Sequence, residues 1–252
     1  MKQSAHAPPF GWLEDAPCCQ AGLQGYSDAA MRIIARRHGA PYCTTESLID
    51  EVLVRGGKGL KAAELDPEDH PIAGQIIGTH PETMARAAKA LLALGYDVID
   101  VNLACPVKKM RGLCRGGHLL TRPIEAAAVL KAVREAVEDA APVTVKMRRA
   151  YDESEESLDR FHRIFETAIE LGYASATVHC RTVKQQYEGA ASWPFLADLT
   201  RRHPGFTILG SGDVFTAESI FEMIAATGVR GVSVARGAIG NPGAAEPASA
   251  KA

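Results

Sequence analysis

The sequence lacks the cysteine spacings that are typical of metal sites and of redox-active pairs. None of its six cysteines belongs to a Cys-x-x-Cys pair or to a zinc-binding spacing, and two of them, Cys18 and Cys19, are adjacent. Isolated thiols of this kind are typical of proteins kept in a reducing compartment. We therefore expect free cysteines, no bound metal and a cytoplasmic location.

Long hydrophobic runs and an excess of one charge are also missing. No segment approaches the roughly 18 consecutive apolar residues of a membrane helix, and residues 1–17 contain no apolar stretch typical of signal peptides. We therefore expect no membrane association. The formal net charge of −2 gives no overall attraction to nucleic acid. Any RNA contact would depend on a local basic patch, and one such patch contains Lys108, Lys109, Arg111 and Arg115.

The sequence does contain a regular alternation of short apolar runs with longer segments of helical periodicity. This alternation is typical of repeated βα units around a parallel sheet. The predicted strands cover residues 19–23, 42–46, 71–78, 96–103, 142–148, 174–181, 206–212 and 231–237. The clearest predicted helices cover residues 28–38, 81–94, 123–137, 158–171 and 216–227.

These elements predict an α/β fold, and eight strands favour a (β/α)8 TIM barrel over an open doubly wound sheet. The chain length of 252 residues suits such a barrel, which needs about 250. After the last predicted strand the sequence is rich in Gly, Pro and Ala, so we expect the eighth helix to be truncated or absent. We expect an N-terminal extension over residues 1–16, one barrel domain over 17–242 and a disordered tail over 243–252.

Polar side chains collect where the predicted strands end. Because the active site of such a barrel is built at the carboxyl ends of its strands, these residues are candidates for a functional site. They are Gln75, Asn102, Cys105, Lys146, Arg148, His179, Arg181, Ser211, Asp213 and Arg236.

Two features of this set point to chemistry. Lys146 lies inside an apolar strand, where an unpaired ammonium group is costly to bury, so a functional role is favoured. His179 and Arg181 are two residues apart and therefore lie on one face of a strand, which favours an anionic or polar ligand. Cys105, taken alone, fits a buried structural thiol as well as an active-site acid or nucleophile.

Six segments, in order, resemble the tRNA-dihydrouridine synthases, which are flavoenzymes on a (β/α)8 barrel. The segments are AGLQGYSDAAMR, NLACPVKKMRGLCRGGHLL, VTVKMR, VHCRTVKQQYEG, LGSGDV and VARGAIGNP, and they span residues 21–242. The resemblance implies bound FMN, NADPH or NADH as the reductant, and an RNA substrate, tRNA in this family. The reaction it implies is the reduction of a flipped-out uridine to 5,6-dihydrouridine.

The resemblance also implies roles for individual residues. Cys105 matches the cysteine of the family's Asn-x-Gly-Cys-Pro loop, which donates a proton to carbon 5 of the uracil. The implied FMN-binding residues are Gln75, Lys146, His179, Gly210, Ser211, Gly212, Ala235 and Arg236, with the glycine-containing turns and Arg236 at the phosphate. The implied substrate-binding residues are Asn102, Arg148, Arg181 and Gln185.

The sequence departs from the family at two places that bear on function. Gly22 replaces the proline of the family's Ala-Pro-Met segment, and we expect a looser contact with the flavin there. We also expect only the barrel, without the helical domain that grips tRNA in the family. Two alternatives therefore stay open: an FMN-dependent reductase of a free pyrimidine or small enone, and a non-catalytic RNA-binding homologue.

Overall fold

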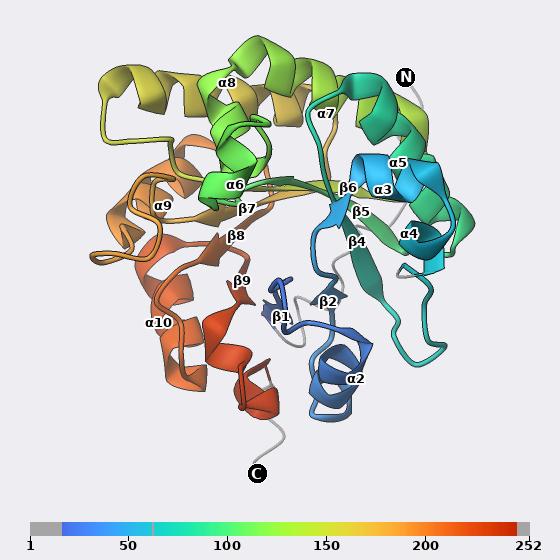
Figure 1. Ribbon diagram of the computed structural model, residues 1–252. Coiled ribbons are helices and arrows are strands. Elements are labelled where there is room, and N and C mark those ends of the chain that lie inside the picture. Colours follow the sequence, from blue (N-terminus) through green and yellow to red (C-terminus); the bar gives the residue numbers. More distant parts are fainter. Residues whose placement is uncertain (1–16, 62, 246–252) are drawn as a thin grey trace.

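The computed structural model describes residues 17–61 and 63–245, which form a closed barrel of parallel strands (Figure 1). The strands are β1 (Cys18–Gln20), β2 (Cys43–Thr44), β3 (Leu48–Ile49), β4 (Ile72–Ile77), β5 (Val98–Leu103), β6 (Val143–Arg148), β7 (Ser175–His179), β8 (Ile208–Ser211) and β9 (Gly231–Val234). Their order around the barrel is β2-β1-β9-β8-β7-β6-β5-β4, and pairing of β2 with β4 closes it. The predicted TIM barrel is confirmed.

The second strand of the barrel is split in two. β2 pairs with the start of β4, where Cys43 faces Ile72, and β3 pairs with its end, where Leu48 faces Ile76. Between them the chain leaves the ladder, and the side-chain Oγ1 of Thr45 accepts a hydrogen bond from the backbone N–H of Gln75 at 3.0 Å. The predicted strand over 42–46 is therefore shorter than expected, and a second short strand follows it.

Sheet pairing is uneven around the barrel. β1 and β2 share the single register pair of Gln20 with Cys43. In contrast, β5 and β6 are paired continuously from Ile99 to Leu103. The first two strands are therefore held to each other by far fewer ladder bonds than the strands on the opposite wall.

The helices lie outside the barrel or at its mouth. They are α2 (Ala29–Arg37), α3 (Asp50–Arg55), α4 (Lys58–Lys61), α5 (Pro81–Ala93), α6 (Lys108–Arg111), α7 (Pro123–Val137), α8 (Glu155–Glu170), α9 (Trp193–Arg202) and α10 (Ala217–Thr227). Short 3-10 helices are η1 (Gly116–Thr121), η2 (Arg236–Ala238) and η3 (Pro242–Ala245). The five predicted helices are confirmed within a few residues, while α3, α4, α6 and α9 are additional.

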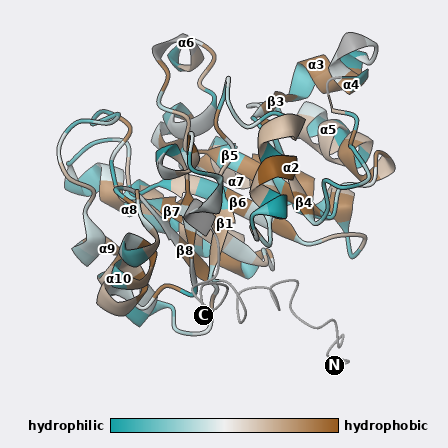
Figure 2. Cartoon of the chain, turned by 90° about the horizontal axis from the view of Figure 1, so that it is seen from below, coloured by the Kyte–Doolittle hydropathy of each residue, from teal (hydrophilic) through white to brown (hydrophobic). Residues whose placement is uncertain are grey.

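The core lies between the outer faces of the strands and the inner faces of the helices. In α8, for example, Phe161, Ile164, Phe165 and Ala168 are buried at the spacing of one helical face. The helix starts where Ser154 caps it by accepting a hydrogen bond from the N–H of Ser157. Figure 2 shows the hydrophobic residues concentrated in the strands, with hydrophilic residues in the loops.

After β9 the described chain contains η2 and η3 and no further α-helix. Residues 243–245, predicted to be disordered, form the end of η3, because the chain still packs on α2 and η2 there. Residues 1–16 and the rest of the predicted tail lie outside the described residues. No helix in the described ranges is long and apolar enough to cross a bilayer.

Candidate active site

An open cavity of about 160 Å³ lies at the carboxyl ends of the strands. In Figure 2, α6 stands apart from the strands at this end of the barrel. The cavity is lined by most of the predicted site residues together with loop residues around them. These are Gly22, Leu23, Gln24, Ser47, Gln75, Asn102, Ala104, Cys105, Pro106, Val107, Lys146, Arg148, His179, Tyr187, Ser211, Ala235 and Arg236.

Cys105 lies half-buried in a loop, residues 104–107, that is anchored from two sides. Its backbone N–H donates to Oδ1 of Asn102 at 3.0 Å, and its carbonyl accepts from the N–H of Gly117 at 3.0 Å. η1 reaches this close because Gly116 has no side chain: a Cβ there would lie 2.8 Å from the Cβ of Cys105. The Gly-Gly pair that follows the cysteine in the sequence therefore supports the Cys105 loop.

Asn102 is fully engaged within the protein. Its Oδ1 also accepts from the N–H of Ala104 at 2.8 Å, and its Nδ2 donates to Ser47 Oγ and to Gln75 Oε1, both at 2.7 Å. An amide has two donor hydrogens and two acceptor lone pairs, and all four are used here. In this structure the amide of Asn102 therefore anchors the Cys105 loop, and its contact with the substrate stays a prediction.

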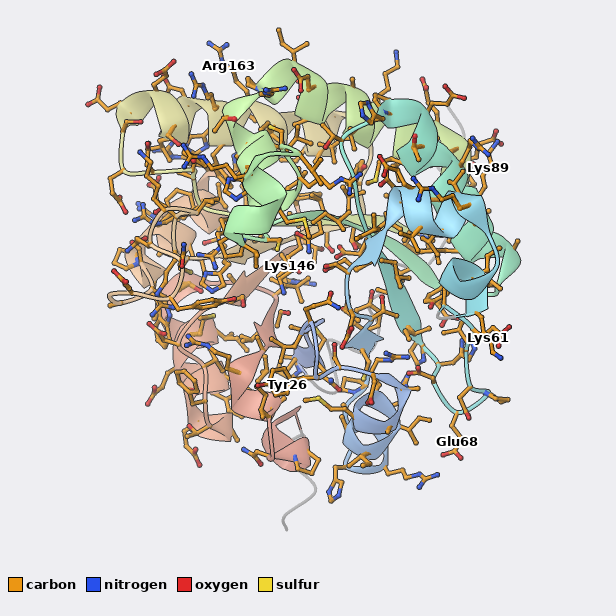
Figure 3. The ribbon with its side chains drawn as sticks, in the orientation of Figure 1. Tyr26, Lys61, Glu68, Lys89, Lys146 and Arg163 are labelled. Carbon is orange, nitrogen blue, oxygen red and sulfur yellow. The ribbon has the colours of Figure 1, made fainter. Side chains whose placement is uncertain are left out.

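Lys146 projects into the barrel from β6 and lies near its centre in Figure 3. It forms no ion pair with any described residue. Burial lowers the pKa of its ammonium group, and the buried carboxylate of Asp100 acts in the opposite direction. The mouth of the barrel therefore contains a cation whose charge is not neutralised by direct contact with the protein.

His179 is a neutral hydrogen-bond donor. Burial, reinforced by Arg148, Lys146 and other cations, lowers its pKa to about 2. Its Nδ1 lies 3.1 Å from the backbone N–H of Arg181 and must accept from it, so the ring proton sits on Nε2. His179 lines the cavity and can donate this proton in a hydrogen bond to an acceptor there.

Arg148 is buried and ties two loops together beneath the cavity. Its Nε donates to the carbonyl of Ala104 at 3.0 Å, and its Nη1 donates to the carbonyls of Thr182 and Gln186 at 2.8 and 2.7 Å. The guanidinium carbon also lies 5.6 Å from the centre of the Tyr187 ring. Arg148 therefore positions the Cys105 loop while lining the cavity.

A second, smaller cavity adjoins the first at the ends of β8 and β9. It is lined by His179, Ser211, Gly212, Asp213, Val214, Phe215, Ser233, Ala235 and Arg236. The guanidinium carbon of Arg236 lies 5.0 Å from the centre of the Tyr187 ring and 5.4 Å from that of Phe215. The predicted phosphate-binding residues Ser211, Gly212, Ala235 and Arg236 thus lie together around one hollow.

Three predicted site residues line neither cavity. Gly210 faces outward, since a Cβ there would contact Met223 and Leu196. Arg181 is held in hydrogen bonds with Asp213 and with the carbonyl of Gly189. The side-chain carbonyl of Gln185 accepts from the N–H of Thr182 and from Arg149. Arg181 and Gln185 therefore organise the loop after β7.

Residues without a role predicted from the sequence also lie at the mouth. Ser47 lies in the break between β2 and β3, and its hydroxyl bridges Gln75 and Asn102. Tyr187 was part of the quoted QQYEG segment but received no role. The backbone at Gly22 lies so close to the next loop that a Cβ there would be 2.0 Å from the carbonyl oxygen of Thr45. A side chain at position 22 would therefore clash with the backbone of Thr45, while the looser flavin contact expected there stays a prediction.

The basic patch is also smaller than predicted. Arg115 is buried, and its Nη2 lies 2.8 Å from Oε1 of Glu51. It therefore belongs to the interior rather than to a surface that attracts RNA. Among the described residues, no three His, Cys, Asp or Glu side chains are grouped so that they could hold a metal ion.

The chain is similar to known proteins over most of its length. The probable tRNA-dihydrouridine synthase 1 of Synechocystis is 31% identical over 224 residues, covering 88% of this chain and 61% of that protein. The probable tRNA-dihydrouridine synthase of Treponema pallidum is 36% identical over 231 residues, covering 88% of this chain and 67% of that protein. The chain thus spans roughly two thirds of the length of these relatives.

Solved structures share the fold at low sequence identity. A histamine dehydrogenase from Rhizobium sp. 4-9 aligns with a TM-score of 0.66 at 16% identity, covering 89% of this chain and 44% of that one. A 2-naphthoyl-CoA reductase complex aligns with a TM-score of 0.68 at 11% identity, covering 90% and 48%. Residues 19–251 match the sequence profile of the dihydrouridine synthase (Dus) family. The chain therefore belongs to the dihydrouridine synthase family.

Proposed function

We propose that the protein reduces uridine to 5,6-dihydrouridine in tRNA. The observation that carries this proposal is the meeting of the Cys105 thiol, the Lys146 ammonium and the neutral His179 donor at one cavity of a barrel from this family. The relatives named above as tRNA-dihydrouridine synthases support the same reaction. Because tRNA is found in the cytoplasm, we propose that the protein acts there.

The residues at the mouth fit FMN. Gln75 and Lys146 line the same cavity, where an amide and an amine would suit the polar edge of a flavin ring. His179 and Arg236 border the second cavity and suit a phosphate group. Bound FMN would supply the hydride for carbon 6 of the uracil, with NADPH or NADH as the source of electrons.

Cys105 would provide the proton. Its thiol gives a proton to carbon 5 of the uracil as the hydride arrives at carbon 6, so the base gains two hydrogens and the cysteine is left as a thiolate. Arg148 holds the carbonyl of Ala104, the residue before Cys105, and the thiolate would take a proton back from water. The backbone hydrogen bonds of the Cys105 loop keep the sulfur at the cavity.

The RNA must present its base outside the stack. A uracil can lie against a flavin only when it is flipped out, and the exposed rings of Tyr187 and Phe215 at the rim offer stacking surfaces for neighbouring groups. α6 begins directly beyond the Cys105 loop, and its sequence, KKMR, is basic. These features favour RNA over a free pyrimidine.

A direct assay tests the proposal. The purified protein is reconstituted with FMN and incubated with an unmodified tRNA transcript and NADPH, and the digested RNA is analysed for dihydrouridine by mass spectrometry. Formation of dihydrouridine supports the proposal. A flavin-containing protein that oxidises NADPH with free uracil but leaves the transcript unchanged supports the small-molecule reductase, and a protein that binds RNA but no flavin supports the non-catalytic alternative.

A further inference from the structure

Asp100 is an acidic residue in the interior of the barrel, where burial raises the pKa of its carboxyl group and hydrogen bonds from Thr144 and Gln75 oppose the shift. Gln75, Asp100 and Thr144 occupy paired register positions on β4, β5 and β6, so their side chains form one layer inside the barrel. Oδ1 of Asp100 accepts from the Thr144 hydroxyl at 2.6 Å, and Oδ2 accepts from Gln75 Nε2 at 2.7 Å. The side chain of Asp100 is buried. A carboxylate in this place costs desolvation energy, which an apolar residue would avoid.

We propose that Asp100 is a positioning residue whose carboxylate fixes the orientation of the Gln75 and Asn102 amides and thereby holds the Cys105 loop in place. The hydrogen bonds from Asp100 through Gln75 and Asn102 to the Cys105 loop are present in the structure. Their importance for uridine reduction rests on the proposed function.

Hydrogen-bond polarity links these side chains. Both carboxyl oxygens of Asp100 accept hydrogen bonds, so Gln75 turns its Nε2 toward Asp100 and its Oε1 the other way. That Oε1 then accepts from Asn102 Nδ2 at 2.7 Å and from the Ser47 hydroxyl at 2.5 Å. Asn102 must in turn direct its Oδ1 toward the two backbone N–H groups of the Cys105 loop. The two ends of an amide have nearly the same shape, so polarity rather than packing selects these orientations.

Asp100 also provides the negative charge that faces Lys146. Both residues line an enclosed space of about 20 Å³ beneath the mouth, which is large enough for one water molecule. The hydroxyl of Ser175 borders the same space and has no hydrogen-bond partner in the described chain. Cys19, Arg148 and Asp100 are the groups that interact electrostatically with Lys146, and of these only Asp100 is a carboxylate.

Three variants separate the carboxylate's orienting role from its charge. Asp100→Asn keeps an acceptor for Gln75 while its amide donates to Thr144, so the chain of orientations is preserved. Asp100→Ala removes that acceptor and frees Gln75 to rotate. Thr144→Val removes the other partner of Asp100 and leaves the link to Gln75 intact, which makes it a matched control.

The readout is hydrogen exchange of the backbone N–H groups of Ala104 and Cys105, followed by mass spectrometry on the purified full chain. We expect at least tenfold faster exchange at these two positions in Asp100→Ala, and rates within threefold of the parent in Asp100→Asn and Thr144→Val. Unchanged exchange in Asp100→Ala would overturn the proposal, as would equal acceleration in Asp100→Asn. If Asp100→Ala does not fold, Gln75→Leu is tested in its place, because it removes the hydrogen bond between Gln75 and Asn102. The same exchange rates are expected, and the same result would overturn the proposal.

This measurement needs neither flavin nor RNA, so it stands even if the proposed reaction fails. Where the reaction is observed, single-turnover kinetics extend the test. We expect Asp100→Ala to slow the reduction of tRNA at least tenfold, with Asp100→Asn restoring it to within threefold of the parent. Slow exchange together with slow tRNA reduction in Asp100→Ala would count against a route through the Cys105 loop.

Discussion

Arg181 and Asp213 are joined by two hydrogen bonds, from Nη2 to Oδ1 at 2.6 Å and to Oδ2 at 2.8 Å. The Arg181 side chain is 4% exposed and also donates to the carbonyl of Gly189. Oδ2 of Asp213 accepts from the N–H of Ala191 at 2.7 Å. The pair therefore fastens the loop after β7 to the end of β8, beside the second cavity.

Removing one member of this pair should destabilise the fold. In Asp213→Ala the buried guanidinium of Arg181 loses its counter-charge, and we expect the free energy of unfolding to fall by about 3 kcal/mol. Urea denaturation measures the change. Asp198 pairs with Arg201 on the surface, so Asp198→Ala should change stability by only about 0.5 kcal/mol. Equal effects of the two substitutions would show that the Arg181–Asp213 pair is not a structural anchor.

His179 should make the protein less stable in mild acid. Its folded-state pKa of about 2 lies below the ordinary value of 6.5, so the unfolded chain binds a proton that the folded chain excludes between these values. Stability is therefore lost as pH falls below about 6.5, by about 1 kcal/mol between pH 7 and pH 5.5. Denaturation of His179→Asn at both pH values should show a smaller loss, and an identical loss would remove His179 as its source.

Cys105→Ala tests the proton donor. We expect FMN binding to persist and the single-turnover reduction of uridine in tRNA to slow by about a hundredfold or more, since general acid catalysis contributes about that much. Cys114→Ala is the matched control, because Cys114 lies nearby and lines neither of the two cavities at the barrel mouth. Its rate should stay within about threefold of the parent. Normal turnover in Cys105→Ala would exclude this thiol from the proton transfer.

Lys146→Met tests the unneutralised cation at the mouth. Methionine keeps the length of the side chain and removes its charge, so we expect FMN affinity to fall at least about tenfold. Quenching of flavin fluorescence on titration with the flavin-free protein measures this. Lys131 lies exposed on α7 beside Glu135, and Lys131→Met should leave the affinity unchanged. A loss of affinity in both variants would point to a general effect of charge rather than to a contact at the site.

The sequence predicts the barrel because each strand is a short apolar run followed by a helix. The sequence does not predict the split of the second strand into β2 and β3. That split involves a hydrogen bond between Thr45 and Gln75, which are 30 residues apart in the sequence. α9 was missed because its apolar face is short and only Leu196 and Leu199 are buried in it.

The sequence predicts that most of the site residues lie at the barrel mouth, but it does not predict which of them make hydrogen bonds within the protein. Strand alternation places Ser211 at the cavity and turns Gly210 outward, a distinction that the period of two already contains. Asn102 resembles a ligand-binding amide in the sequence, yet its Nδ2 donates to Ser47 and Gln75 from other parts of the chain, and its Oδ1 accepts from the N–H groups of Ala104 and Cys105. Hydrogen bonds between residues that are distant in the sequence can be identified only from the structure.

The uneven sheet pairing gives the barrel a seam. β1 and β2 meet through the one register pair of Gln20 with Cys43, and Gly22, Leu23 and Gln24 extend from this seam to the mouth. A ligand that contacts this segment on one side and Ser47 or Gln75 on the other would bridge the join between β1 and β2. Occupation of the mouth would then stabilise the closed barrel against opening at this join.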